Sequence, residues 1–348
     1  MRPFRHAVLA VLLSLCFVVS AWAEAPKNVI LLIGDGMGPE QVKAAGLYGH
    51  GEAGTLEMEK YYVGTMTTHS ANRGGEHKGT TDSAAAGTAI ATGHKTKNRI
   101  VSQTPEGEDL TTVLEIFAKA GKRTGLVTTC PMTHATPASF GAHAETRYEY
   151  GDIAADYFER SRPNVLFGAY YAKGKGVTAE QARQAGYTVV TTRDELQTVV
   201  EKAGPGADPH VSGQFAEGQI PWEYTGPLPE EGKKNRKHAG EGKATFETVP
   251  HLSEMAHAAL SLLAPDPDGF FLMIEGGTID WAGHDNCIEW NVTETLEFDK
   301  TCRLVLDWAA RRDDTLVIIT ADHECGGLKV IEGRGKGKMP EVVWESKG

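Results

Sequence analysis

The sequence predicts an α/β fold in which helices cover both faces of a mainly parallel β-sheet. Three short apolar runs, at 28–33, 269–275 and 315–320, have the length and β-branched content of buried parallel strands. Segments with helical periodicity alternate with these runs, as in folds built from strand–helix–strand units. The 348 residues suffice for one large domain or two ordinary ones, and no internal repeat or low-complexity tract divides them.

The first 23 residues have the features of a secretory signal peptide. Two arginines precede an apolar run from 7 to 20, and the triplet at 21–23 matches a small-x-small cleavage site. The run is too short to favour an uncleaved membrane anchor. We therefore expect a secreted, periplasmic protein without a stable membrane anchor, whose folded domain comprises residues 24–348.

The charge of the chain limits its partners. The N-terminal segment carries two arginines and no carboxylate, so its removal changes the formal net charge from -11 to -13. Such an acidic protein is not expected to bind nucleic acid. Its field would also repel anionic ligands, so a phosphate site here needs local positive charge from metal ions or arginine.

Four cysteines follow the N-terminal segment: Cys130, Cys287, Cys302 and Cys325. They form no C-x-x-C pair, so a structural zinc knuckle is not indicated. An oxidising compartment would allow one or two disulfides among them, but the spacing does not determine the pairing.

The first half of the folded domain alternates strands and helices. The strand at 28–33 ends in a glycine-rich loop that carries Asp35. Asp82 is a good helix cap before an Ala-rich run at 84–92, which places Ser83 in the first helical turn. The further elements expected here are a helix at 110–120, a strand at 124–129 and a helix at 138–147 that carries Arg147.

The second half begins with a weaker pattern. Glycine, proline and lysine interrupt the segment 163–248, which we interpret as a less regular excursion from the core with an exposed loop at 233–237. Regular periodicity then returns. The elements expected after the excursion are a helix at 249–263, a strand at 269–275, a helix at 293–311 and a strand at 315–320.

Acidic and imidazole side chains follow the three apolar strands. These residues are Asp35 after the first strand, Glu275, Asp280 and His284 after the second, and Asp322 and His323 after the third. One strand-end aspartate is more often a helix cap, but if the strands are parallel neighbours the whole set converges at one sheet edge. Four carboxylates and two imidazoles cannot be desolvated together without cations. Mixed carboxylate and imidazole ligands suit zinc, and oxygen ligands suit magnesium, so the pattern predicts a multinuclear metal site.

Four motifs in this order resemble those of the alkaline phosphatase family. They are the segment 28–38 (NVILLIGDGMG), the segment 81–88 (TDSAAAGT), the segment 275–284 (EGGTIDWAGH) and the segment 320–323 (TADH). The resemblance runs from about Lys27 to the end of the chain and is weakest between 163 and 248. It implies a three-layer α/β/α sandwich around a mainly parallel central sheet, and hydrolysis of small phosphate monoesters by a homodimer.

The resemblance also implies two Zn²⁺ and one Mg²⁺. Asp35 would bridge one zinc and the magnesium, and Asp322 and His323 would complete the ligands of that zinc. Asp280 and His284 would hold the other zinc.

The magnesium and the reacting groups are implied in the same way. Glu275 and Thr136 would bind magnesium, with His134 beside them at a position where relatives carry Asp or His. Ser83 would be the nucleophile that forms a phosphoserine, activated by zinc and by its place at a helix N-terminus. Arg147 would donate to two non-bridging phosphate oxygens, unless it serves only in a surface ion pair.

One part of the family pattern is not matched. Relatives take a further zinc ligand from a His-Thr-Gly segment, and this sequence ends before the place of that histidine. We therefore expect a two-ligand site at Asp280 and His284, with slow or absent turnover. The alternatives are a non-catalytic, secreted metal-binding homologue or fragment, or a phosphodiesterase or sulfatase of the same superfamily. The Asp82-Ser83-Ala84 motif with Arg147 favours monoesters, and no G-x-S-x-G elbow surrounds the serine.

Overall fold

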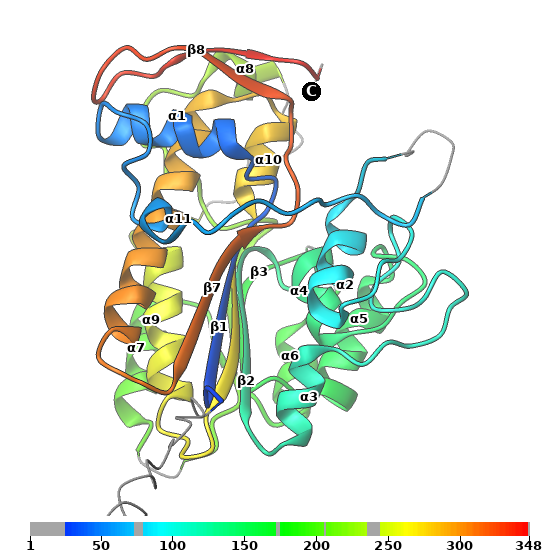
Figure 1. Ribbon diagram of the computed structural model, residues 1–348. Helices are drawn as coiled ribbons and strands as arrows, with labels where there is room; N and C mark the ends of the chain where they lie inside the picture. The colour runs from blue at the N-terminus through cyan, green and yellow to red at the C-terminus, as the bar shows by residue number, and fades with distance from the viewer. Residues whose placement is uncertain (1–24, 73–78, 172–174, 205–206, 235–243, 347–348) are drawn as a thin grey trace, which may run out of the picture.

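The computed structural model describes residues 25–72, 79–171, 175–204, 207–234 and 244–346 (Figure 1). The expected signal peptide at 1–23 and residues 235–237 of the expected exposed loop lie outside these ranges. None of the helices within the described ranges combines the length and the apolar character that crossing a membrane requires.

Seven strands within the described ranges form a central sheet with the order β4-β5-β3-β2-β6-β1-β7. All neighbouring pairs run parallel. The strands are β1 (Asn28–Gly34), β2 (Arg123–Pro131), β3 (Val165–Tyr170), β4 (Thr188–Val190), β5 (Val211–Glu217), β6 (Phe270–Gly276) and β7 (Thr315–Ala321). The predicted parallel sheet is therefore confirmed.

Helices cover both faces of the sheet (Figure 1). One face carries α2 (Ser83–Thr92), α3 (Val113–Lys119), α4 (Ala135–Gly141), α5 (Tyr150–Asp156) and α6 (Ala179–Gln184), and the other carries α7 (Arg193–Lys202), α9 (Leu252–Leu263) and α11 (Ile288–Ala309). Alternate residues of β1 supply the two cores, because side chains point to opposite faces along a strand. Ile30 and Leu32 pack in one core and Leu31 and Ile33 in the other. The chain thus has the predicted three-layer α/β/α sandwich.

A smaller group of elements lies beyond the carboxyl ends of the strands, at the top of Figure 1. It contains α1 (Pro39–Gly49), α8 (Glu230–Lys234), α10 (Thr278–His284) and an antiparallel pair of strands, β8 (Leu328–Glu332) and β9 (Glu341–Trp344). Two short turns complete the list, a 3-10 turn at Met58–Tyr61 and a π turn at Tyr157–Ser161. Together α1, α10 and the strand pair surround the end of the sheet at which the predicted site residues lie.

The predicted helix at 138–147 is wrong in its second half. Helix α4 ends at Gly141, and Arg147 lies in the loop before α5. Val101 and Ala144 exchange two backbone hydrogen bonds of 3.0 Å, and the amide of Arg147 donates to the carbonyl of Arg99. This pairing with a distant segment holds the chain extended where local periodicity favours a helix.

The segment 163–248 is more regular than its sequence pattern indicates. It contributes β3, β4 and β5 to the sheet, with β3 placed between β2 and β5. Strand β4 has only three residues, and glycine interrupts β3 and β5, which weakens the strand signal in the sequence.

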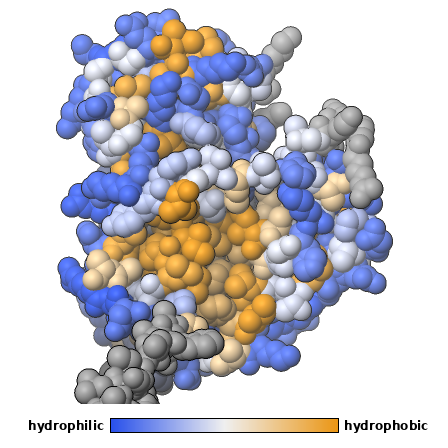
Figure 2. All heavy atoms as spheres, in the orientation of Figure 1, coloured by the Kyte–Doolittle hydropathy of each residue, from blue (hydrophilic) through white to orange (hydrophobic). Residues whose placement is uncertain are grey.

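Strand β7 is an edge of the sheet and is only partly covered. Leu316 and Ile318 are 44% and 42% exposed. An open apolar groove lies beside this edge and is visible as the large orange area of Figure 2. Its lining includes Val29, Leu31, Met66, Ile90, Val113, Phe271 and Ile318.

Candidate metal-binding active site

The carboxyl ends of three neighbouring strands bring the predicted metal ligands together. Gly34 of β1 pairs with Gly276 of β6 on one side and with Ala321 of β7 on the other. Asp35 and Asp322 are the residues that follow β1 and β7, and both are fully buried. The predicted convergence of side chains from these three strands is confirmed.

Asp35, Asp322 and His323 form the first group of candidate ligands, with ligand atoms within 4.8 Å of one another. His323 Nε2 lies 3.4 Å from Asp35 Oδ1 and 3.5 Å from Asp322 Oδ2. The other oxygen of Asp322 accepts from the amides of Gly36 and His323, at 3.1 and 2.8 Å. These bonds fix the carboxylate and leave Oδ2 facing the group.

Ser83 is the first residue of α2 and lies beside this group. Its Oγ donates to Asp35 Oδ1 at 3.4 Å and lies 3.3 Å from His323 Nε2. Asp82 caps the helix by accepting from the amide of Ala85 at 3.0 Å. The cap therefore determines where the helix starts, and with it the position of the hydroxyl.

His134 and Glu275 form the second group together with Asp35. All three side chains are buried. The hydroxyl of Thr128 donates a short hydrogen bond to Glu275 Oε2. Thr136, in the first turn of α4, is also fully buried, and its hydroxyl lies on the Glu275 side of the cluster.

Arg147 joins two sides of the site. Its Nη1 donates to Asp82 Oδ2 at 3.2 Å, and its Nη2 lies 3.0 Å from His134 Nε2. Burial opposes its charge, but the carboxylates of Asp82 and Asp35 outweigh that effect and raise the pKa of the guanidinium. The side chain therefore remains a fixed cation next to Ser83 and the carboxylates, which is the local positive charge that an anion needs here.

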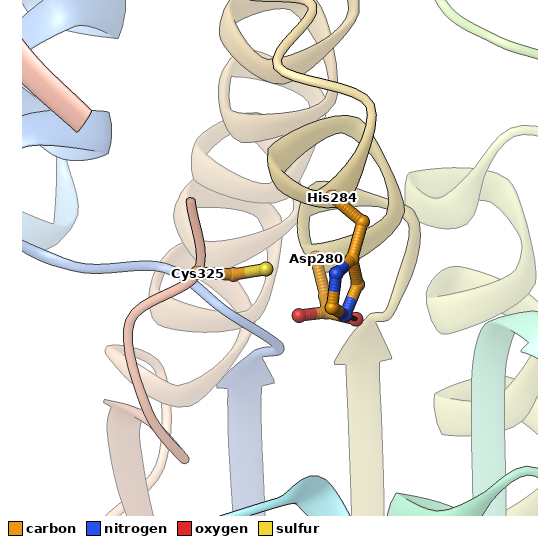
Figure 3. A group of neighbouring side chains, drawn as sticks. All are labelled: Asp280, His284 and Cys325. Atoms are coloured by element: carbon orange, nitrogen blue, oxygen red, sulfur yellow. Dashed lines mark ion pairs between the residues drawn. The ribbon is translucent and has the colours of Figure 1, made fainter. Parts of the chain in front are cut away.

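Asp280, His284 and Cys325 form the third group (Figure 3). Asp280 and His284 lie one turn apart on α10, with His284 Nε2 3.5 Å from Asp280 Oδ2. Cys325 comes from the loop after β7, two positions beyond His323. The motif at 275–284 contains the first two residues, whereas Cys325 lies outside all four motifs and its proximity to them was not expected from the sequence.

Burial dominates the electrostatics of the carboxylates. It raises the pKa of Asp35 well above its usual value, with further increases from the charges of Asp322 and Asp280. It raises the pKa of Glu275 to about 7, although the hydroxyls of Thr128 and Thr136 act in the opposite direction. For Asp322, burial also raises the pKa, and the charge of His323 offsets only part of it.

Asp280 and Cys325 differ from the other groups. Burial opposes ionisation of Asp280, but the nearby imidazoles of His284 and His323 outweigh burial and lower its pKa. Burial, followed by the negative charge of Asp280, raises the pKa of the Cys325 thiol. Without a cation, the third group thus consists of an ionised carboxylate beside a neutral thiol.

The cluster has the properties of a site built for cations. Among the described residues, buried carboxylate oxygens without a hydrogen-bond partner include Asp35 Oδ2, Glu275 Oε1, Asp280 Oδ1 and Asp322 Oδ2. Buried acceptors are normally paired, so four of them in one cluster indicate ligands that bind something other than a hydrogen atom. Carboxylate oxygens with imidazole nitrogens fit Zn²⁺, and the oxygens of Asp35, Glu275 and Thr136 fit Mg²⁺.

Comparison with known proteins gives the family. The family model described as alkaline phosphatase matches residues 26–165 and 168–344. Alkaline phosphatase 3 of Bacillus subtilis is 36% identical over 317 residues, which are 87% of this chain and 62% of that protein. The chain thus spans less than two thirds of the length of this relative.

Solved structures agree with the sequence match. A cold-active alkaline phosphatase of Shewanella sp. superposes with a TM-score of 0.73 at 31% identity, covering 88% of this chain and 71% of that chain. A variant of the alkaline phosphatase of the Antarctic bacterium TAB5, solved with Mg bound in its M3 site, superposes with a TM-score of 0.69 at 26% identity, covering 92% of this chain and 87% of that chain. The family match covers nearly all of the described residues, and this chain belongs to the alkaline phosphatase family.

Proposed function

We propose that this chain hydrolyses small phosphate monoesters through a phosphoserine on Ser83, with two Zn²⁺ and one Mg²⁺ as cofactors. Family membership supports the reaction class, and the Mg bound to the TAB5 variant supports a magnesium site. The observation that carries the proposal is the position of Ser83 Oγ, 3.4 Å from Asp35 Oδ1 and 3.3 Å from His323 Nε2. A hydroxyl at a helix N-terminus beside ligands for divalent cations is suited to attack a phosphate ester.

The three groups of side chains suggest the ligands. Asp35, Asp322 and His323 would hold one zinc, and Asp280 and His284 would take part in holding the other. The proposed magnesium ligands are Asp35, Glu275 and Thr136, with His134 beside them. Bound divalent cations would neutralise the phosphate and favour ionisation of the nucleophile.

Ser83 performs the nucleophilic attack. Its hydroxyl loses its proton to solvent, the Oγ–phosphorus bond forms while the bond from phosphorus to the ester oxygen breaks, and the leaving alcohol takes a proton from solvent. Water then attacks the phosphoserine, which releases phosphate and restores the hydroxyl. The N-terminus of α2 favours the negative charge on the phosphoryl oxygens throughout both steps.

Arg147 would bind the non-bridging oxygens. Its side chain is only 15% exposed and is held by Asp82 Oδ2 at 3.2 Å, so it is oriented before a substrate enters. A guanidinium can donate to two oxygens at once, which fixes the phosphoryl group in line with Ser83. The same group would also bind the inorganic phosphate product.

The test is hydrolysis of 4-nitrophenyl phosphate at alkaline pH with added Zn²⁺ and Mg²⁺. Ser83→Ala is expected to lose activity and the covalent phosphoserine that mass spectrometry detects after an acid quench. Ser261→Ala is the matched control, because Ser261 lies on α9 and its Oγ donates only to the carbonyl of His257. Wild-type activity in Ser83→Ala would contradict the proposal.

The same assay separates the alternative functions. A phosphodiesterase would prefer bis(4-nitrophenyl) phosphate, and a non-catalytic homologue would bind metals without hydrolysing either ester. The secreted periplasmic location and the homodimer remain predictions. Cell fractionation tests the location, and sedimentation tests the oligomeric state.

A further inference from the structure

We propose that Cys325 is a metal ligand, whose Sγ binds zinc together with Asp280 and His284. This inference rests on the proposed function, because the same site would hold one of the two catalytic zinc ions. It adds a sulfur ligand to the two side chains that the sequence motif identifies.

The geometry of the three side chains supports this assignment. One ligand atom from each residue lies within 4.8 Å of the other two, and His284 Nε2 is 3.5 Å from Asp280 Oδ2. Figure 3 shows the cysteine sulfur pointing from the loop after β7 toward the two residues on α10. Ligand bonds to zinc are about 2.0–2.3 Å long, so a small movement brings all three atoms onto one ion.

The backbone holds the cysteine in this orientation. The amide of Cys325 donates to the carbonyl of Gly36 at 3.1 Å, and its carbonyl accepts from Gln41 Nε2 at 2.8 Å. A Cβ at Gly36 would lie 2.8 Å from the Cβ of Cys325, and a Cβ at Gly283 would lie 3.2 Å from its Sγ. Both neighbours are glycine, so the loop and α10 approach closely and the thiol faces Asp280.

Asp280 supplies a second, independent observation. Its side chain is 4% exposed, and its Oδ1 is among the buried oxygens that have no hydrogen-bond partner in the described part of the chain. A buried carboxylate oxygen without a hydrogen-bond partner is a suitable ligand for a cation. Carboxylate oxygen, imidazole nitrogen and cysteine sulfur are all common donors to zinc in proteins.

The other cysteines provide a contrast within the same protein. Cys130, Cys287 and Cys302 are also buried and free, yet within the described ranges none of them belongs to a group with metal-ligand spacing. Cys302 packs in the hydrophobic core beside α9 and β1. A cysteine that served only as a small apolar residue would not need to face a carboxylate and an imidazole.

Binding of a cation to the thiol releases one proton. The sulfur–hydrogen bond breaks, the proton passes to solvent, and the thiolate binds the divalent cation without oxidation or reduction. A thiolate favours Zn²⁺, Co²⁺ or Cd²⁺ over Mg²⁺. The groups containing Asp322 and Glu275 have no sulfur, so among the groups found in the described residues a sulfur–metal signal comes from the one with Cys325.

The experiment loads the full chain with Co²⁺ and records its absorption spectrum. Wild type is expected to show a thiolate-to-cobalt charge-transfer band in the near ultraviolet. Cys325→Ser should lose the band and bind Zn²⁺ at least about tenfold more weakly. Cys302→Ala, the matched control, should keep both the band and the zinc affinity.

A second measurement uses the wild-type protein alone, so its result does not depend on whether a substituted protein folds. Zn²⁺ is expected to slow alkylation of Cys325 by iodoacetamide, followed by mass spectrometry of its peptide, while EDTA restores the rate. A cobalt complex without the charge-transfer band, or alkylation of Cys325 that Zn²⁺ does not change, overturns the inference. Hydrolysis with no band refutes only the cysteine ligand, whereas a band without hydrolysis refutes only the proposed function.

Discussion

Ser83 Oγ lies 3.3 Å from Nε2 of His323, although 240 positions separate the two residues in the sequence. Ser83 starts α2 and His323 follows β7. Strands β1 and β7 are paired, so Asp35 and His323 lie together at their carboxyl ends and both contact Ser83. The sheet therefore aligns the proposed nucleophile with the proposed zinc ligands before any substrate binds, which limits the reorganisation needed for catalysis.

Replacing Arg147 should weaken phosphate binding. Arg147→Ala is expected to raise KM for 4-nitrophenyl phosphate, and Ki for inorganic phosphate, by about 10- to 100-fold, because charge-assisted hydrogen bonds contribute about 1.5–3 kcal/mol. Arg147→Lys should recover only part of the loss, because lysine keeps the positive charge but cannot donate to two phosphate oxygens at once. Arg160→Ala is the control, because Arg160 is half-exposed and pairs with Asp109 away from the site. Equal KM values for Arg147→Ala and wild type would refute this role.

Removing the cap of α2 should affect both stability and activity. Asp82→Ala loses the bonds to the Ala85 amide and to Arg147, and we expect the free energy of unfolding to fall by about 1–2 kcal/mol. Thr178→Ala removes the equivalent cap of α6, where Thr178 accepts from the amide of Gln181. Chemical denaturation should show similar losses for both variants, but kcat should fall only in Asp82→Ala. A similar kcat loss in both would mean that the effect is general destabilisation.

The metal-free protein should lose stability as pH rises from about 5 to 8. Burial raises the pKa values of Asp35, Glu275 and Asp322, so the folded state holds their protons more tightly than the unfolded state. The stabilisation from these protonated carboxyl groups is complete at a pH below their pKa values in the unfolded chain. It is lost as the pH rises through their pKa values in the folded protein, which for Glu275 is about 7. For Glu275 alone the change is on the order of 3 kcal/mol. Thermal melts in EDTA measure it, and Zn²⁺ with Mg²⁺ should restore stability at pH 8. A melting temperature in EDTA that rises with pH would contradict this expectation.

Glu294 provides a second pH dependence outside the metal ligands. Burial, followed by the charge of Glu223, raises its pKa to about 8, and its oxygens accept from Thr278 Oγ1 and the Glu223 amide. Folding therefore becomes less favourable as pH rises from the unfolded pKa to about 8. Glu294→Gln removes the titration and should exceed wild type in stability at pH 8 by up to about 4 kcal/mol, with a much smaller difference at pH 5. Asp307→Asn, an exposed change on the same helix, should show no such pH dependence. Identical pH profiles for Glu294→Gln and wild type would count against the assignment.

The central part of the fold was predictable because its strands are buried on both faces. Runs such as β1 and β6 are continuously apolar, and their ends carry the charged residues of the site. The helix expected at 138–147 failed because Ala144 pairs with Val101, a contact between distant segments that local periodicity does not report. Strands β3 and β5 were missed as part of the sheet because glycines interrupt short apolar runs.

The candidate site was predictable to a similar degree and for a related reason. Motifs identify residues at strand ends, and a parallel sheet brings strand ends together, so Asp35, Glu275 and Asp322 were expected to meet. Cys325 was not expected, because its contact with Asp280 depends on how the loop after β7 folds over Gly36. Its place two positions after His323 is the one signal in the sequence that points to it.

Strand β7 leads into Asp322 and His323 without an intervening residue, and its outer side has no paired strand among those the structure describes. A polypeptide that pairs with β7 along this side could shift the strand, and with it the two proposed ligands that follow it. Binding along the edge of β7 would then change the affinity of the site for metal ions. If copies of the chain paired along this edge, concentrated samples would differ from dilute ones in metal affinity as well as in aggregation.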